Sequence, residues 1–401
     1  MQSIKDIFRI GNGPSSSHTM GPLRATRIFK EKHTNASSFR VTLYGSLAAT
    51  GKGHFTDTAI INEFKPVSTE IIWRPKEFLP EHPNGLTFEA IDSNGNTLDS
   101  WTTFSIGGGA LWEDNLNSPT QVYPHKNMHE ILHYLNNSGK TYWEYVEEFE
   151  GPEIWIYLTE VWEAMKNSIH NGLENDGVIP GALHLSRKAA LYNTRSQGFS
   201  GSLKRKTLLF SYALAVSEEN ASCGKVVTAP TCGSCGVLPA VLYHISKDYE
   251  MADNKILKAL ATAGIFGNVI KTNGSISGAE VGCQGEIGSA CAMAAAAATK
   301  LFGGTPPQIE YAAEMGLEHH LGLTCDPIGG FVQIPCIERN AFAATRALDA
   351  SAFAILSDGH HYISFDKVIE TMLQTGHDLP SLYKETSIGG LAAIVKEKDE
   401  D

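Results

Sequence analysis

The sequence predicts two regions of different fold class, namely a small N-terminal α+β domain built on an antiparallel sheet and a large, mainly α-helical domain. The length of 401 residues exceeds that of one ordinary domain. Apolar runs typical of strands dominate residues 39–109, whereas helix-forming residues dominate beyond residue 141. We expect an α+β domain at 1–125, a linker at 126–140, a helical domain at 141–395 and a disordered acidic tail at 396–401.

Four apolar runs define the expected strands of the first domain. They cover Phe39–Tyr44, Thr69–Trp73, Leu86–Ile91 and Trp101–Ile106. Asn94 and Gly95 lie between the last two runs, and an Asn-Gly step favours the positive φ angles of a tight hairpin turn. Helical patterns at Gly21–Lys32 and Thr56–Phe64 complete the domain.

Six longer helical patterns define the second domain. They cover Glu153–His170, Leu203–Glu219, Lys255–Val269, Ile287–Phe302, Pro307–Leu317 and Asn340–Leu356. The segment Ala290–Ala298 is rich in alanine, a side chain that leaves little space between neighbouring backbones. This helix should therefore lie in the interior, surrounded by other helices.

The composition restricts the classes of function. The formal net charge is −12 and no basic run is longer than 204–206, so nucleic-acid binding is not expected. No apolar stretch reaches the roughly 18 residues of a membrane span, and the N-terminus lacks the pattern of a secretory signal. We expect a soluble, cytoplasmic protein. Its seven cysteines, an odd number, favour metal binding or catalysis over a disulfide framework.

The segment Gly11–Pro22 places hydroxyls and one imidazole at the start of an expected helix. A helix N-terminus attracts anions, so this segment could hold a carboxylate. The hydroxyls belong to Ser15, Ser16, Ser17 and Thr19. His18 has the right side chain to move a proton near neutral pH. The alternative is an ordinary helix cap with a surface histidine.

A second glycine-rich segment, Tyr44–Asp57, superficially resembles a phosphate-binding loop. It fails that test because five residues instead of four separate Gly45 from Gly51, and Gly53 follows the lysine. A nucleotide site is not expected. His54 in this loop is a candidate to face a cleft, and the alternative is a histidine in a turn.

Three cysteines lie in separate polar loops rich in glycine and proline, namely Cys283, Cys325 and Cys336. Their spacing matches no zinc finger. Three thiolates from separate loops can hold an iron–sulfur cluster and leave one iron without a protein ligand, free to act as a Lewis acid. The alternative is three small buried cysteines. Cys232 and Cys235 form a further pair with the spacing of zinc or redox sites, which is only suggestive alone.

Taken together, these motifs resemble the bacterial iron–sulfur-dependent L-serine dehydratases, also called L-serine ammonia-lyases. The resemblance runs almost end to end. Its motifs, in the family's order, are Gly13–Pro22, Tyr44–Asp57, Ser105–Gly109, Pro180-Gly181, Glu218–Asn220, Val226–Thr231, Thr272–Gly285, Glu318–Arg339 and Ser387–Leu391. The family implies a small beta-chain domain, similar to an allosteric substrate-binding domain, followed by a helical catalytic domain.

The resemblance also implies a cofactor and roles for residues. A [4Fe–4S] cluster would be held by Cys283, Cys325 and Cys336, and the two histidine motifs of the family fall on His18 and His54. The polar groups expected near the substrate are Ser15, Ser16, Ser17, Thr19, Asn273, Ser275 and Ser277. The implied reaction converts L-serine into 2-aminoacrylate and then into pyruvate and ammonia.

Two departures from the family pattern concern cysteine. Many relatives have Asn-Gly-Ala-Ala-Gly where this chain has Cys232-Gly-Ser-Cys235-Gly, and some end in a cysteine that this chain lacks. We expect water or hydroxide on the open iron at rest, unless Cys232 or Cys235 comes within bonding distance. The expected assembly is a homodimer.

Three other functions remain open at this stage. On the same scaffold, β-elimination of cysteine would release sulfide, since iron binds thiols readily. A non-catalytic amino-acid sensor would use Cys232 and Cys235 as ligands of a structural zinc ion. A pyridoxal enzyme would need a lysine, and Lys271 is the one site that mimics it, although we do not expect pyridoxal dependence.

Overall fold

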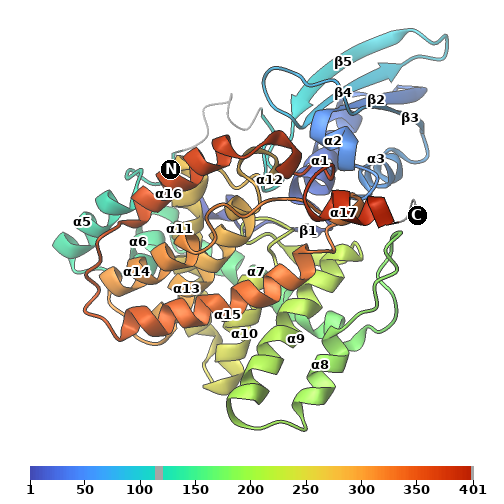
Figure 1. Ribbon diagram of the computed structural model, residues 1–401. Helices are drawn as coiled ribbons and strands as arrows, with labels where there is room; N and C mark the ends of the chain where they lie inside the picture. The colour runs from blue at the N-terminus through green and yellow to red at the C-terminus, as the bar shows by residue number, and fades with distance from the viewer. Residues whose placement is uncertain (113–120, 399–401) are drawn as a thin grey trace.

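The structure is a computed structural model that describes residues 1–112 and 121–398 (Figure 1). It confirms the predicted fold class, with a small sheet region and a large helical region. In Figure 1 the sheet lies at one end of the molecule, at the upper right, and the helices fill the rest. Within the described ranges, no helix combines the length and the apolar character needed to cross a membrane.

The small region is built on a sheet with the strand order β3-β2-β4-β5. The strands are β2 (Ser38–Tyr44), β3 (Ser68–Arg74), β4 (Gly85–Ile91) and β5 (Thr97–Phe104). Along β2, buried side chains alternate with half-buried ones, as expected where one face of a sheet is covered. The cover consists of α1 (Gly21–Lys32) and α3 (Thr56–Phe64), which contribute Phe29 and Phe64 to the core of this region.

One edge of the sheet differs from the prediction. β3 is parallel to β2, whereas the β2–β4 and β4–β5 pairs are antiparallel. Parallel neighbours need a crossover of about a dozen residues or more. The chain between β2 and β3 provides this crossover with α2 (Gly45–Thr50) and α3, so the sheet is mixed.

The helical region surrounds α13 (Ser289–Leu301), and residues 290–298 have 0% exposure, which confirms the predicted interior helix. Gly316 lets α14 (Pro306–Glu318) approach it, because a Cβ there would lie 2.9 Å from Cα of Ala292. The other helices are α5 (Met128–Ser138), α6 (Tyr142–Glu150), α7 (Ile154–Glu174), α8 (Ala189–Ser196), α9 (Gly201–Ala221), α10 (Val237–Asp248), α11 (Asp253–Asn273), α12 (Gly278–Val281), α14 (Pro306–Glu318), α15 (Cys336–Ile355), α16 (Phe365–Asp378) and α17 (Leu391–Lys398).

The start of the chain packs with the helical region, although the expected first domain begins at residue 1. Strand β1 (Ile10–Asn12) pairs with β6 (Lys225–Val227), and Ile7 and Phe8 are buried in the helical core. The chain returns to this core at Tyr123. The sheet region is therefore inserted into the helical fold, because the apolar side chains before β1 pack against helices and not against the sheet.

Two further boundaries differ from the prediction. The expected linker at 126–140 contains α5, which is capped by Asn127 and packs Ile131 and Leu135 into the helical core. The expected disordered tail at 396–401 begins inside α17, so residues 396–398 are helical. Residues 399–401 lie outside the described part of the chain.

Candidate active site

The structure brings the three predicted cysteines together. Cys283 precedes a π-helical turn, Cys325 lies in the loop after α14, and Cys336 begins α15. All three side chains are buried. The Cys325 thiol lies within hydrogen-bonding reach of Cys283 and lowers the pKa of Cys283, whereas burial and the charge of Cys283 raise the pKa of Cys336. Their mutual influence shows that the three thiols lie close to one another.

Arg339 provides the positive charge beside these sulfurs. It lies one turn after Cys336 on α15, and its Nη1 donates a hydrogen bond to the Thr324 carbonyl at 2.7 Å. Although burial opposes its charge, Cys283 and Cys336 raise the pKa of Arg339. The guanidinium therefore stays charged and favours thiolates at this location.

Two carboxyl groups complete the surroundings of the cysteines. Burial, followed by the charge of Glu385, raises the pKa of Glu286 to about 8, and its Oε1 accepts a hydrogen bond from Thr231 at 2.7 Å. Burial and the charge of Cys283 also raise the pKa of Glu385 to about 8. Perturbed carboxyl groups beside thiols are typical of functional sites.

Glu385 belongs to a C-terminal segment that packs against the Cys325 loop. The Glu385 amide donates to the Cys325 carbonyl at 2.9 Å, and the Ser387 hydroxyl donates to the Pro327 carbonyl at 2.7 Å. Glu385 has a φ of 58°, which is uncommon outside glycine and often accompanies function. Further along, the Leu391 amide donates to Asp326 at 2.9 Å. This segment holds Glu385 over the cysteines.

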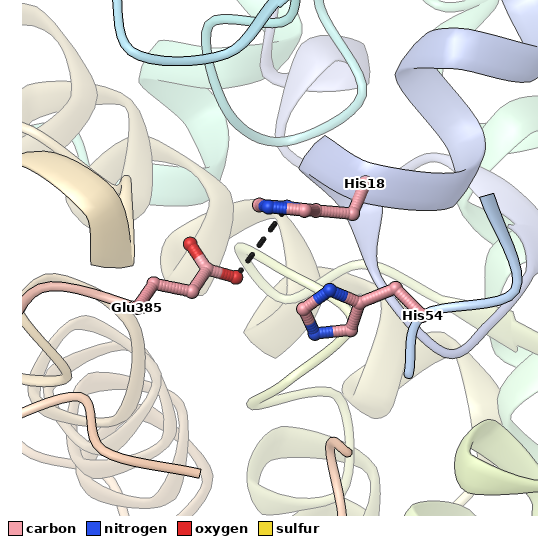
Figure 2. A group of neighbouring side chains, drawn as sticks. All are labelled: His18, His54 and Glu385. Carbon is pink, nitrogen blue, oxygen red and sulfur yellow. Dashed lines mark ion pairs between the residues drawn. The ribbon is translucent and has the colours of Figure 1, made fainter. Parts of the chain in front are cut away.

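The sheet region contributes both predicted histidines to the same site. His18 lies in a π-helical turn (Ser16–Met20) and His54 in the loop between α2 and α3. Figure 2 shows the two imidazoles and the Glu385 carboxylate facing one another. The ring centroids are 4.4 Å apart, and Nδ1 of His18 lies 3.5 Å from Oε1 of Glu385. One potential ligand atom from each of these three residues lies within 4.8 Å of the other two, a spacing that could hold a metal ion.

The two histidines differ in their hydrogen bonds. Nε2 of His18 lies 3.2 Å from the Ser46 carbonyl, which only accepts, so this nitrogen carries the proton and Nδ1 accepts from the Ser17 hydroxyl at 2.9 Å. Neither nitrogen of His54 has a partner among the described residues. Burial lowers the pKa of His18 to about 4 and lowers that of His54. Both rings are therefore neutral, and His54 is free to bind a ligand.

The serine-rich segment serves partly as a scaffold for these histidines. Ser15 caps the π-helical turn by accepting from the His18 amide at 3.0 Å. The Thr19 hydroxyl donates to the His54 carbonyl at 2.8 Å, and Thr56 donates back to the His18 carbonyl at 2.5 Å. A capping role for Ser15 is thus present, but His18 has 0% exposure and is not a surface histidine. Ser16 and Ser17 are buried beside it.

The segment Asn273–Ser277 is divided between two locations. Ser277 has a buried hydroxyl without a hydrogen-bond partner among the described residues, and it precedes Gly278, where a Cβ would lie 3.3 Å from Sγ of Cys325. Ser275 donates to Glu280 and lines a pocket of about 530 Å³ between the two regions. Asn273 instead donates to the Lys126 and Val269 carbonyls at the end of α11, so the structure does not bring it to the cysteines.

The second cysteine pair is not linked to the first three by a direct contact among the described residues, although burial, Cys235 and Glu286 raise the pKa of Cys232. Sγ of Cys232 lies 3.7 Å from Sδ of Met20, and Cys235 is enclosed in the helical core. The group of potential metal ligands found among the described residues consists of His18, His54 and Glu385 and includes none of the cysteines. Lys271, the pyridoxal candidate, donates to Gln2 at 2.9 Å.

Sequence reasoning missed Glu385 and Arg339 as members of the site. Arg339 ends a motif that was recognised, so its position one turn after Cys336 was an available signal. Glu385 stands in an ordinary polar run with no local signal. Its hydrogen-bonded neighbour Ser46 is 339 residues away in the sequence.

Comparisons with known proteins match two families, one after the other along the chain. Residues 3–68 and 62–115 match the family described as serine dehydratase beta chain, and residues 92–392 match serine dehydratase alpha chain. The "L-serine dehydratase" of Streptomyces coelicolor is 40% identical over 98% of this chain and 99% of its own length. The Haemophilus influenzae protein of that name is 39% identical over 98% and 99%. "L-serine dehydratase 1" of Escherichia coli is 39% identical over 99% and 100%.

Proposed function

Since the chain belongs to the serine dehydratase family and carries beta-chain and alpha-chain regions in one polypeptide, we propose that it is an L-serine ammonia-lyase. In this reaction the α-proton and the β-hydroxyl of L-serine leave as water and give 2-aminoacrylate. The imine form of that product then takes up water and yields pyruvate and ammonia. One observation carries the proposal, namely that three thiols from the helical region and two histidines from the sheet region meet around Glu385.

The cysteine site fits the [4Fe–4S] cluster that the sequence implies. Cysteine thiolates are the usual ligands of such clusters, and Cys283, Cys325 and Cys336 offer three of them from three separate segments. Gly278 lets the backbone lie close to them, because a Cβ there would lie 2.8 Å from Oε2 of Glu286 and 3.3 Å from Sγ of Cys325. When bound, the cluster supplies a Lewis-acidic iron that stabilises the negative charge developing as the C–O bond breaks.

His54 is the proposed base for the α-proton. Its imidazole is neutral and fully buried, and both its nitrogens lack partners among the described residues. A neutral imidazole can take up one proton at a free nitrogen. The neighbouring pair of His18 and Glu385 is the proposed source of the proton that converts the leaving hydroxyl into water.

Hydroxyl groups are the proposed contacts of the substrate carboxylate. Ser277 is the strongest of these candidates because its buried hydroxyl lacks a partner among the described residues. Ser16 remains a candidate in the π-helical turn, whereas Ser17 donates its hydroxyl to Nδ1 of His18. Ser15 and Thr19 already use their hydroxyls within the protein and are proposed to position the others. Ser275 lines the pocket between the regions and is proposed to contact substrate on its way in.

An anaerobic preparation of the full chain tests this function. Iron and labile sulfide are measured together, and pyruvate formation from L-serine is compared with that from L-cysteine. We expect iron with sulfide and faster turnover of L-serine. Zinc without sulfide and no turnover would support the sensor function, and faster turnover of L-cysteine would support β-elimination of sulfide.

A further inference from the structure

Helix α15 has an exposed face with unusually large apolar side chains. Phe342, Phe353 and the adjacent Leu356 are 69%, 60% and 88% exposed. In Figure 1 this helix runs across the near side of the helical region. Patches of large exposed apolar side chains on a soluble protein commonly mark interaction sites.

Two opposite charges lie between the apolar residues of this face. Arg346 and Asp349 are both exposed and occupy the middle of the stripe Phe342-Arg346-Asp349-Phe353. At about 100° per residue, these four side chains fall within roughly 60° of one another around the helix axis. Arg346 donates a single hydrogen bond to the His319 carbonyl at 3.2 Å, and Asp349 has no hydrogen bond or ion pair with a described residue. Both charges therefore have capacity for another partner.

The order of the stripe is symmetric about the point midway between residues 347 and 348. Arg346 and Asp349 lie at equal distances on either side of that point, and so do Phe342 and Phe353. In an antiparallel pair of identical helices, a two-fold axis through this point sets Arg346 of each copy against Asp349 of the other. It also sets Phe342 against Phe353. An isologous contact needs this self-complementarity.

We propose that α15 pairs in the antiparallel direction with α15 of a second copy of this chain. The charges fix the register of the pair, and the phenylalanines supply its apolar area. Hollows of about 570 Å³ and 730 Å³ flank α15, both partly lined by Asp349, and provide space for the side chains of the other copy. Aromatic and arginine side chains are enriched in protein interfaces. This inference does not depend on the proposed catalytic activity.

Charge reversals test both the surface and its register. The masses of the full-length holoprotein and its variants are measured by analytical ultracentrifugation. We expect a dimer for the natural chain, and for Arg346→Asp or Asp349→Arg a dissociation constant at least about a hundredfold higher, because each variant places like charges together at two symmetric contacts. The double variant Arg346→Asp with Asp349→Arg restores opposite charges and should dimerise again.

Mixing the two single variants gives the sharpest result. One copy then carries two negative charges at 346 and 349 and the other carries two positive ones, so the mixture should form heterodimers although each variant alone is monomeric. Lys367→Glu, at an exposed i,i+3 ion pair with Glu370 on α16, is the matched control and should leave the mass unchanged. Unfolding curves establish that each variant is folded.

Three results would overturn the proposal. A natural chain that stays monomeric at micromolar concentration has no such interface. Dimeric single variants would place the interface on another surface. Folded single variants that are monomeric, but are rescued neither by the double variant nor by mixing, would exclude the antiparallel register.

Discussion

The two regions contribute different chemistry to one site. The helical region supplies charged, mutually coupled groups, in which Arg339 and the thiols of Cys283 and Cys336 change one another's pKa. The sheet region supplies two imidazoles that burial keeps neutral, fastened by hydrogen bonds from Thr19 and Thr56. The difference teaches that, under the proposed function, binding a cofactor and moving a proton would be separable tasks of the two regions. Replacing one of the mutually coupled groups should change the pKa values of the groups around it. Replacing an imidazole should remove only its proton transfer.

The largest effect is expected from the cysteines. Changing Cys283, Cys325 or Cys336 to serine should remove both the proposed cluster and detectable turnover, since each would supply one of three ligands. Iron, labile sulfide and pyruvate formation are measured under anaerobic conditions. Cys291→Ser is the matched control, because this buried thiol lies in α13 and contacts the Ala343 carbonyl. Single variants that all keep iron, sulfide and activity would show that these cysteines hold no cluster.

The next largest effect is expected from His54, whose imidazole lacks a hydrogen-bond partner among the described residues. His54→Asn should lower kcat by about 10²- to 10⁴-fold, the usual contribution of a general base, while iron and sulfide stay at the natural level. His33→Asn, a histidine paired with Asp99 in the sheet region, is the control and should keep its turnover. Loss of iron from the His54 variant would contradict the separation of tasks between the regions.

A smaller effect is expected from the C-terminal segment, which joins the two sets of groups through Glu385. A chain ending at Thr386 loses the Ser387 and Leu391 hydrogen bonds to the Cys325 loop, and its activity should fall about tenfold. A chain ending at Val395 keeps both bonds and should be nearly as active as the natural one. Steady-state rates with L-serine compare them. Equal losses would mean that residues 396–401 themselves close the site.

The smallest effect is expected from a buried carboxyl group of the helical region that lies away from the thiols. Burial, then Glu318 and Glu310 on the same helix, raises the pKa of Glu314 to about 7, although His361 opposes the shift. The native state therefore binds more protons than the unfolded state between about pH 4.5 and 7, and stability falls as the pH rises through that range. Glu314→Gln should add about 1–3 kcal/mol to the free energy of unfolding at pH 8 and little at pH 4.5. Urea unfolding at both values measures this, and a gain that is independent of pH would refute the ionisation argument.

Sequence patterns were most informative where residue type and local pattern act together, although the roles of the site residues stay predictions. Cysteines and histidines in loops rich in glycine and serine stood out, and the structure brings Cys283, Cys325, Cys336, His18 and His54 into one neighbourhood. The fold class followed from the change in periodicity along the chain. Both signals are local, so a single sequence contains them.

What the sequence could not reveal depends on long-range packing. Glu385 is an unremarkable acid until the chain folds it against His18, and Asn273 resembles a substrate ligand until α11 turns it toward Lys126. The parallel direction of β3 likewise depends on how α2 and α3 cross the sheet. Each outcome is decided by partners far away in the sequence, about which local patterns carry no information.

The pairing of β1 with β6 also has a consequence for biosynthesis. Residues 10–12 leave the ribosome early, but their partners at 225–227 follow more than 200 residues later. At about 5–20 residues per second, the first strand waits roughly 10–40 seconds for its partner. During that time the apolar side chains of Ile4, Ile7 and Phe8 have no helical core to enter. The nascent N-terminus is therefore the segment of this chain that we expect chaperones to shield first.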